Sequence, residues 1–410
     1  MVNAKALGVI AEFNPFHNGH AYLLQQARAE AGDRPVIAVM SGNFVQRGEA
    51  ALLDKWTRAR IAVSCGVDLV LELPVSFCVR SAEYFALGGV KVLAATGVVD
   101  KLVFGVESLP TLNADLLAAY LNSPQATERF KFFMRQNHNY GAAWEKTATE
   151  WHPQAGSCLQ GPNNILAMSY RRAIQLSKAD LEPLPILRQG NDYNDTRLHA
   201  PFASATALRD ALYQRLPWTE IMNCVPPQTL QALQAHELFN EPVQPLKMLL
   251  AYELLNCKVD QLYERTISDY GLCFRMLKQR EALREGWENY LAAVTNKRYP
   301  KPSLKRIFLQ LLLHEDRDFW QHTLDPEYLR VLAFNDRGRY LLRSMKNKAT
   351  LPILTKAGGL RRKDHAASFN RQLALDARAG DLYQLLHYHF GQYGSDFATS
   401  PARLEKHPLS

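Results

Sequence analysis

The 410-residue sequence lacks any long hydrophobic run. No stretch approaches the roughly 18 consecutive apolar residues that a membrane-spanning helix requires. The first ten residues, MVNAKALGVI, also contain neither an extended apolar segment nor the small-residue site at which a secretory signal is cleaved. The sequence therefore predicts a soluble, cytoplasmic protein with no membrane partner.

Cysteine is scarce and poorly placed for metal or disulfide chemistry. No two of the six cysteines form a CxxC pair, so the sequence indicates neither a zinc ribbon nor a disulfide framework. The six residues are Cys65, Cys78, Cys158, Cys224, Cys257 and Cys273. We expect them to be buried or incidental thiols, and we expect no protein-bound metal.

Negative charge is in deficit, because 40 acidic residues face 48 lysines and arginines; the net charge is +8 and the isoelectric point is near 9.1. Such an excess favours a polyanionic partner, although many basic proteins bind no nucleic acid. Two late clusters carry much of this charge, and the aromatic rings of Tyr340 and Phe369 beside them offer stacking surfaces for RNA. Solvated helix faces are the alternative interpretation. The candidates for tRNA contact are Arg337, Arg339, Arg343, Lys346, Arg361, Arg362 and Lys363.

The apolar pattern changes near residue 215. Before this point, short apolar segments alternate with helical ones, as is typical of a Rossmann-like α/β fold with a parallel sheet. Strands are expected at residues 7–10, 36–40, 68–71, 101–104 and 184–188, and helices at 22–31, 55–64, 83–95 and 165–174. Amphipathic patterns at 246–255, 272–291 and 303–314 then predict a mainly α-helical part. We expect two domains, residues 1–215 and 216–410.

One segment near the N-terminus has the composition of a nucleotide phosphate site. The first strand runs into a loop that carries His17 and His20 on either side of Gly19, and a helix follows at once. The N-terminus of a helix attracts anions through its unpaired N–H groups and its dipole. Gly19 lets a phosphate approach the backbone, and the two imidazoles can donate hydrogen bonds to phosphate oxygens. The loop is therefore expected to bind a nucleoside triphosphate.

The His-x-Gly-His pattern alone has two other interpretations. A pattern of four residues can occur in any loop, and paired histidines can also bind a metal. The position of this pattern favours the phosphate interpretation, because α/β folds bind ligands at such strand-to-helix turns.

The loop at residues 41–49, with the sequence SGNFVQRGE, follows the second expected strand at the same edge of the sheet. Its many hydrogen-bonding groups indicate either a wall of the substrate pocket or a tight turn that needs its glycines. Lys55 and Arg58 follow on the next helix, and we expect them on its solvated face.

Four further residues are candidates at this edge. Gly105 follows a strand, where the missing Cβ lets a base or ribose approach the backbone, although a plain turn explains it equally well. Asn163 and Asn164 precede a helix and either cap it or hydrogen-bond an adenine edge. Arg188 lies at the carboxyl end of the last expected strand and either contacts phosphate or ribose or forms a surface salt bridge.

A second helix start also has phosphate-binding composition. Ser204 and Thr206 supply hydroxyl groups, and Arg209 lies about one helical turn later. Such a start binds phosphate through its N–H groups and the guanidinium. A capped surface helix is the alternative.

Together these segments resemble the nucleotidyltransferase superfamily with the His-x-Gly-His signature, in which that loop and a later Ser-Thr-x-x-Arg-type segment bind triphosphate. Longer runs are similar to those of the bacterial tRNA(Met) cytidine acetate ligase family: EFNPFHNGH at residues 12–20, MSGNFVQRGE at 40–49 and PNNIL at 162–166. No Lys-Met-Ser-Lys-Ser signature is present, which argues against an aminoacyl-tRNA synthetase.

The resemblance implies an ATP-dependent ligase. ATP and acetate would form acetyl-adenylate with release of pyrophosphate, and the acetyl group would pass to N4 of the wobble cytidine of elongator tRNA(Met). Mg²⁺ would accompany ATP, and the basic helical domain would hold the tRNA. His17 and His20 would be the catalytic residues, stabilising the phosphates. The expected ATP contacts are Ile10, Ala11, Glu12, Phe13, Asn14, Pro15, Phe16, His17, Asn18, Gly19, His20, Ala21, Tyr22, Leu23, Gly105, Asn163, Arg188, Ser204, Thr206 and Arg209.

Two other functions stay open on the sequence alone. An adenylyltransferase could act on a small phosphorylated cofactor precursor without RNA, but the large basic helical part argues against it. A noncatalytic RNA-binding protein could retain a degenerate nucleotide fold, but the intact His17, Gly19 and His20 argue against that.

Overall fold

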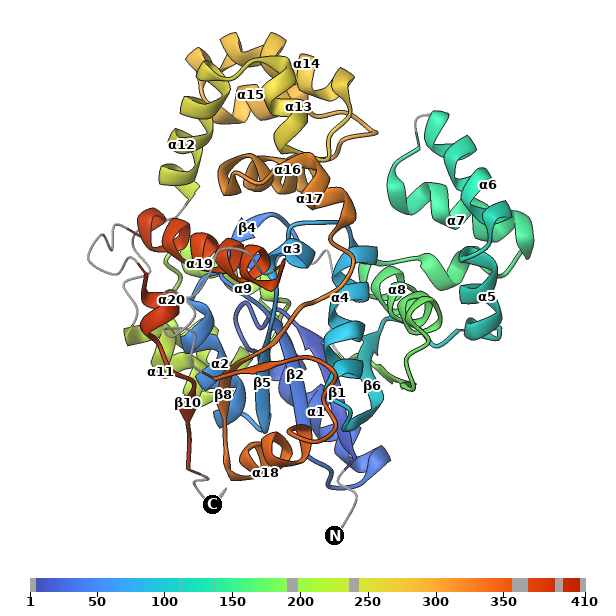
Figure 1. Cartoon of the computed structure of the whole chain (residues 1–410), viewed down its shortest axis with the longest axis vertical. Helices are drawn as coiled ribbons and strands as arrows, with labels where there is room; N and C mark the ends of the chain where they lie inside the picture. Colours follow the sequence, from blue (N-terminus) through green and yellow to red (C-terminus); the bar gives the residue numbers. More distant parts are fainter. Residues whose placement is uncertain are drawn as a thin grey trace.

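The computed structural model describes residues 5–110, 112–136, 138–189, 198–235, 243–355, 368–387 and 394–405. A central sheet runs through the middle of the molecule, with helices on both faces (Figure 1). Its strands lie in the order β10, β8, β5, β2, β1, β6, β7, and β9 pairs with β8. Their bounds are β1 Ala6–Ala11, β2 Val36–Ser41, β5 Leu69–Leu73, β6 Val99–Val106, β7 Glu182–Leu187, β8 Leu329–Phe334, β9 Ile353–Leu354 and β10 Ala402–Arg403.

The five strands from β5 to β7 in this order are parallel and confirm the predicted α/β sheet. Side chains of β1 alternate between the two faces, as the two-residue period of a strand requires. Leu7 and Val9 join the core on one face, and Ala6 and Ile10 join the core on the other. Because both faces are covered, these strands are almost wholly apolar.

Each face of the sheet has its own helices. The first is covered by α1 (Asn18–Ala31), α2 (Lys55–Ser64) and α9 (Ala205–Tyr213), and the second by α4 (Ala82–Ala95), α8 (Pro162–Ser177) and α18 (Asp336–Met345). The two-stranded hairpin of β3 (Phe44–Val45) and β4 (Glu49–Ala50) rises from the end of β2. The short helix α3 (Val75–Cys78) follows β5.

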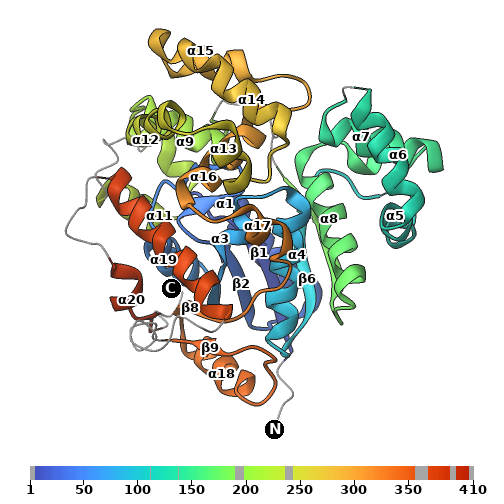
Figure 2. The ribbon, with the colours of Figure 1, turned by 45° about the horizontal axis from the view of Figure 1, so that its top comes forward.

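Two helical lobes stand beyond the carboxyl ends of the parallel strands. One contains α5 (Ala114–Leu121), α6 (Pro124–Arg135) and α7 (Tyr140–Trp151), followed by the 3₁₀ turn η1 (Gly156–Leu159), and has its own apolar core. The other contains α12 (Val243–Asn256), α13 (Val259–Arg265), α14 (Tyr270–Lys278), η3 (Gln279–Glu285), α15 (Trp287–Val294) and α16 (Lys301–Leu313). Figure 2 shows them side by side, with α6 and α7 to the right of α14 and α15.

The remaining helices connect these parts. They are α10 (Trp218–Ile221), η2 (Met222–Cys224), α11 (Pro227–Ala235), α17 (Arg317–His322), α19 (Ser368–Leu386) and α20 (Ser395–Ala398). The chain beyond residue 216 is thus mainly helical, as the sequence predicts. No described helix combines the length and the apolar character that crossing a membrane requires.

Two features of the second half differ from the sequence prediction. The prediction of a single helix at 272–291 is wrong. The helical run is interrupted at Gly286, because its φ of 110° does not fit a helix. β8, β9 and β10 were not anticipated, and β8 and β10 extend the sheet of the first half, β8 antiparallel to β5. The division at residue 215 stays a prediction, although the sheet itself draws strands from both sides of it.

The predicted solvated positions of Lys55 and Arg58 are also wrong, since both side chains are only 1% exposed. Lys55 Nζ lies 2.7 Å from both Glu72 Oε1 and Asp396 Oδ2, and Arg330 contacts the same two carboxylates. Buried charges of this kind need partners of opposite charge. Here the two carboxylate partners, Glu72 and Asp396, are more than 300 residues apart in the sequence. The cluster ties the C-terminal segment to the sheet.

Candidate active site

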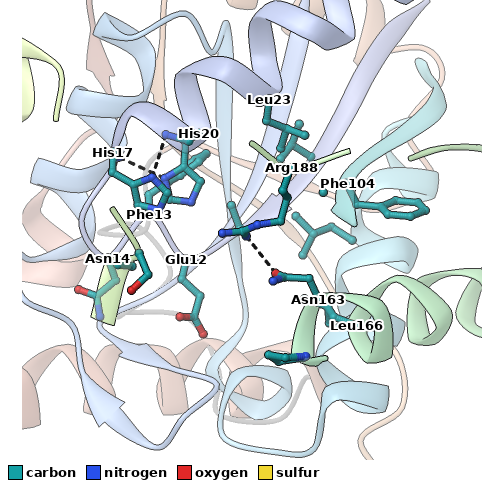
Figure 3. A pocket seen from close by; sticks show the side chains of 18 of the residues that line it. Glu12, Phe13, Asn14, His17, His20, Leu23, Phe104, Asn163, Leu166 and Arg188 are labelled. Carbon is teal, nitrogen blue, oxygen red and sulfur yellow. Dashed lines mark hydrogen bonds between the residues drawn. The ribbon is translucent and has the colours of Figure 1, made fainter. Parts of the chain in front are cut away.

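A cavity of about 370 Å³ opens at the carboxyl ends of β1, β6 and β7. Its walls come from the β1–α1 loop, the β3–β4 hairpin and the starts of α8 and α9, so that segments from both halves of the first 215 residues meet there. Figure 3 shows the side chains that point into it. This is the edge at which open α/β sheets bind ligands.

His17 and His20 form a stacked pair at the start of α1, with ring centroids 3.8 Å apart. His17 is the N-cap: its Nδ1 accepts from the N–H of Gly19 at 3.0 Å, and the N–H of His17 donates to Nδ1 of His20 at 3.2 Å (Figure 3). A neutral imidazole whose Nδ1 accepts carries its proton on Nε2. Both rings therefore present an Nε2–H donor beside the N-terminus of α1.

Both imidazoles are neutral at neutral pH. Burial lowers the pKa of His17 to about 3, and the charges of Arg188 and Arg209 act in the same direction. Burial also holds the pKa of His20 well below its usual range, with His17 and Arg188 adding to the effect. The pair can therefore donate hydrogen bonds to phosphate oxygens without gaining a proton of its own.

Three arginines supply the positive charge of the cavity. Arg209 Nη1 donates to the carbonyl oxygen of Asn14 at 2.9 Å, which fixes the guanidinium below the β1–α1 loop. Arg209 and Arg47 both approach Thr206 Oγ1, at 3.4 Å. Ser204 is the N-cap of α9 and accepts from the N–H of Ala207. The second helix start thus lines the same cavity as the first, as the phosphate interpretation requires.

Arg188 is positioned by a short chain of polar contacts. Its Nη1 donates to Asn163 Oδ1 at 3.2 Å, and Asn163 Nδ2 donates to Glu107 Oε1 at 2.7 Å. Gly105 lies beneath it, where an added Cβ would come within 3.1 Å of Arg188 Cγ. The N-cap of α8 is Gly161, so capping by Asn163 or Asn164 is not the reason for these asparagines.

Glu12 is the only carboxylate among the described residues that line the cavity. Its Oε1 accepts from the N–H of Gln46 at 2.8 Å, and burial raises the pKa of the carboxyl against the opposing effect of Arg209 and Arg47. Asn14 is 2% exposed; its Oδ1 accepts from the N–H of Leu52, while its Nδ2 has no partner among the described residues. An amide N–H group without a hydrogen-bond partner at the wall of the cavity is suited to bind an oxygen atom of a ligand.

The structure brings most of the predicted ATP contacts together around this cavity. Those that line it are Ile10, Ala11, Glu12, Phe13, Asn14, His17, Gly19, His20, Tyr22, Leu23, Gly105, Asn163, Arg188, Ser204, Thr206 and Arg209. Pro15, Phe16, Asn18 and Ala21 do not: Phe16 is in the core, and the Asn18 amide donates to the carbonyl oxygens of Pro201 and Asn223.

Other lining residues carry no recognisable sequence signal. Apolar side chains on α4, β6 and α8 also line the cavity, and such an apolar lining suits a nucleotide base. These are Phe85, Val103, Phe104, Ile165, Leu166 and Tyr170. Gln46 and Arg47 belong to the loop that the sequence marked as a possible pocket wall, and the structure places them there.

The predicted tRNA contacts on α18 lie far from this cavity. β8 runs antiparallel to β5, so the helix that follows it sits at the edge where the parallel strands begin, at the bottom of Figure 1. Arg337 is paired there with Asp33, which follows α1. Arg339 and Arg343 are exposed on the same helix, and Lys346 is exposed at its C-cap. Arg361, Arg362 and Lys363 lie outside the described residues.

Comparison with known proteins agrees with this geometry. A family model described as HIGH Nucleotidyl Transferase matches residues 4–395. A tRNA(Met) cytidine acetate ligase of Syntrophomonas wolfei is 36% identical, covering 96% of this chain and 98% of its own length. That of Limosilactobacillus reuteri is 37% identical, with 93% and 96% covered.

Solved structures of TmcAL from Thermotoga maritima have the same fold. The apo form superposes with a TM-score of 0.87 at 29% identity, covering 98% of this chain and 100% of that one. A second form, bound with alpha-thio ATP, superposes with a TM-score of 0.84 and the same coverage. The chain belongs to the HIGH nucleotidyl transferase family and, within it, to the tRNA(Met) cytidine acetate ligases.

Proposed function

We propose that the protein is a cytoplasmic enzyme that activates acetate with ATP and acetylates N4 of the wobble cytidine of elongator tRNA(Met). The observation that carries this proposal is the neutral histidine pair at the N-terminus of α1, facing Arg47, Arg188 and Arg209 across one cavity. Full-length similarity to tRNA(Met) cytidine acetate ligases, and a related structure bound with alpha-thio ATP, support the same substrates.

In the first step, an acetate oxygen attacks the α-phosphorus of ATP, and the bond from that phosphorus to the α,β-bridging oxygen breaks. Pyrophosphate leaves and acetyl-adenylate remains. In-line phosphoryl chemistry needs positioning and charge neutralisation rather than covalent help from the protein. The Nε2–H groups of His17 and His20 would stabilise the developing charge, while Arg209 and Ser204 at α9 hold the leaving pyrophosphate.

In the second step, the exocyclic amine of the cytidine attacks the acetyl carbon. The new N–C bond forms as the C–O bond to the phosphate breaks, and AMP leaves. The apolar wall at Phe85, Leu166 and Tyr170 would exclude water from the reactive anhydride, because hydrolysis of acetyl-adenylate competes with transfer.

Mg²⁺ would arrive with ATP. The cavity fits a metal that is held mainly by phosphate oxygens and water, since the lining offers a single carboxylate, that of Glu12. At the triphosphate the ion would neutralise charge on the leaving pyrophosphate. The histidines and arginines would position the nucleotide whether or not the metal is present.

Incorporation of labelled acetate into tRNA(Met) tests this function. Purified protein with ATP should transfer label to tRNA, and digestion should recover it as N4-acetylcytidine. A tRNA in which uridine replaces the wobble cytidine is the matched control and should stay unlabelled. Label in both tRNAs, or in neither, would contradict the assignment. Transfer of AMP to a small phosphorylated cosubstrate, with release of pyrophosphate, would instead identify an adenylyltransferase.

A further inference from the structure

A second cleft of about 580 Å³ separates the two helical lobes. One wall is the turn from α6 into α7, and the other is the segment that joins α15 to α16, both seen above α8 in Figure 2. We call it the interlobe cleft. Its lining residues are Gln136, His138, Asn139, Ala142, Thr295, Asn296, Lys297, Pro300 and Lys301.

The interlobe cleft has the chemistry of a site for a polyanion with hydrogen-bonding bases. Lys297 and Lys301 are exposed, and neither forms an ion pair within the described part of the chain. The nearby Arg298, in contrast, is paired with Asp269. The described lining residues include no carboxylate, while their amide and hydroxyl groups can contact base edges. Positive charge without acidic neighbours favours phosphate binding.

Both walls of the cleft lead to the ATP cavity. On one side, Gly141 at the start of α7 packs against Ile165, which lines that cavity. On the other side, α16 continues from Lys301 to Arg306, whose Nη1 donates to the carbonyl oxygen of Gln46 at 3.2 Å. Gln46 also lines the ATP cavity. A chain held in the cleft could therefore extend a base to the nucleotide.

We infer that the interlobe cleft holds the anticodon arm of the tRNA, with Lys297 and Lys301 on its phosphates. The inference rests on the proposed function and deepens it, because it selects the surface that RNA uses. RNA then lies at the edge of the molecule opposite the basic residues of α18. A tRNA loop bound at α18 would have to cross the sheet to reach ATP.

Charge reversal on the two surfaces distinguishes them. One variant combines Lys297→Glu with Lys301→Glu, and the other combines Arg343→Glu with Lys346→Glu on α18, so that both change the net charge equally. The probe is a fluorescent hairpin RNA with the sequence of the tRNA(Met) anticodon arm, and its Kd is measured by anisotropy over a series of KCl concentrations.

The cleft variant should weaken binding by about tenfold or more and reduce the slope of log Kd against log salt by about two. The α18 variant should stay within about twofold of the parent protein, as expected for exposed charges outside an interface. Equal losses, a larger loss on α18, or no hairpin binding by the parent protein would overturn the inference. Acetate-dependent ATP–pyrophosphate exchange, measured on the same samples without RNA, reports separately whether the proposed chemistry is present.

Glu12 carries a second, independent inference about the same reaction. Its carboxyl is the one acidic group among the described lining residues of a cavity otherwise rich in cations. The N–H of Gln46 holds Oε1, while the side chain extends below the two imidazoles (Figure 3). A carboxylate serves poorly as a phosphate ligand, so its place in this site needs another reason.

We propose that Glu12 is the general base for acetyl transfer. As the cytidine amine attacks the acetyl carbon, one N4 proton passes to the free oxygen of Glu12 and AMP departs with its electron pair. Burial raises the pKa of this carboxyl, which brings its basicity closer to that needed near neutral pH. This inference also rests on the proposed function.

The Glu12→Gln variant tests this role, since its amide oxygen can still accept from the N–H of Gln46. The ratio of acetyl transfer to ATP–pyrophosphate exchange should fall about 100-fold or more, and the rise of the transfer rate with pH should disappear. Glu12→Asp should retain that pH dependence at a lower rate. An unchanged ratio would overturn the proposal, and so would an equal loss of both activities, which would make Glu12 a group for ATP or Mg²⁺ instead. Failure of exchange in the parent protein would count against the proposed function itself.

Discussion

Replacing His20 with alanine isolates the contribution of one Nε2–H donor to adenylate formation. His20 occupies the third position of α1, its Nδ1 bound to the N–H of His17, so its remaining donor faces the cavity. Loss of one such donor from a charge-stabilising site typically lowers the rate by about 10²–10³-fold, or about 2.7–4 kcal/mol. We expect that reduction in acetate-dependent ATP–pyrophosphate exchange.

The same substitution also removes a capping hydrogen bond, which costs about 0.5–2 kcal/mol of folding stability. α1 is anchored in the core by Leu24 and Ala27, so the fold should persist, as circular dichroism and urea unfolding can establish. His20→Gln is the matched control. Glutamine at this position can reach back to the same N–H and restore the cap, but it supplies no imidazole.

Both variants should therefore lose exchange to a similar extent, while binding of the anticodon hairpin stays within about twofold, since His20 lies in the ATP cavity rather than the interlobe cleft. Recovery of exchange in His20→Gln would refute the reasoning, because it would show that the imidazole is not required. An equal loss of exchange and RNA binding with an unchanged fold would refute it as well.

The remaining predictions concern protonation, positioning and stability. Because the pKa of His17 is lowered to about 3 and that of His20 is lowered too, both donors stay neutral, and exchange should not decline as pH rises from about 6 to about 8; a fall with a midpoint near the ordinary histidine value would contradict this. Gly161→Ala would place a Cβ 1.8 Å from Glu107 Oε2 at a φ of 87°, so the Glu107–Asn163–Arg188 contacts should shift and the KM for ATP should rise about tenfold; an unchanged KM would rule out that chain of contacts. Lys55→Met should lower the free energy of unfolding by about 3–5 kcal/mol in urea, because it leaves the buried pair Glu72 and Asp396 with the charge of Arg330 alone to balance them. Lys101→Met, which breaks the surface pair with Glu182, should cost at most about 1 kcal/mol, and similar losses in the two variants would contradict the account.

The parts of the site that the sequence predicts are those encoded locally. The strand, the loop and the helix that hold His17 and His20 are contiguous, so periodicity and residue type alone indicate a phosphate site there. The fold class follows in the same way from the alternation of short apolar strands and helices, and the structure confirms it.

Convergence of distant residues could not be predicted from residue patterns alone. Arg209 contacts the carbonyl oxygen of Asn14 across 195 positions of sequence, and Gln46 and Arg47 reach the cavity only because the β3–β4 hairpin folds over it. The same holds for the burial of Lys55, whose partner Asp396 is supplied by the C-terminal segment. Local sequence made that lysine look like part of a solvated helix face.

β8 shows where the prediction of secondary structure from sequence reaches its limit. Its apolar residues lie between helical segments, and the pairing with β5 joins positions more than 250 residues apart. A short apolar run in such a context does not distinguish strand from helix. Gly286 illustrates the opposite case, where a helical pattern continues across a residue whose backbone ends the helix.

Acetate-dependent exchange of pyrophosphate into ATP tests the central claim most directly. The purified protein should exchange label between pyrophosphate and ATP only when acetate is present, and other small carboxylates should support little exchange. This result would establish acyl-adenylate formation in the cavity of His17 and His20. Absence of exchange with acetate, even after tRNA is added, would contradict the account.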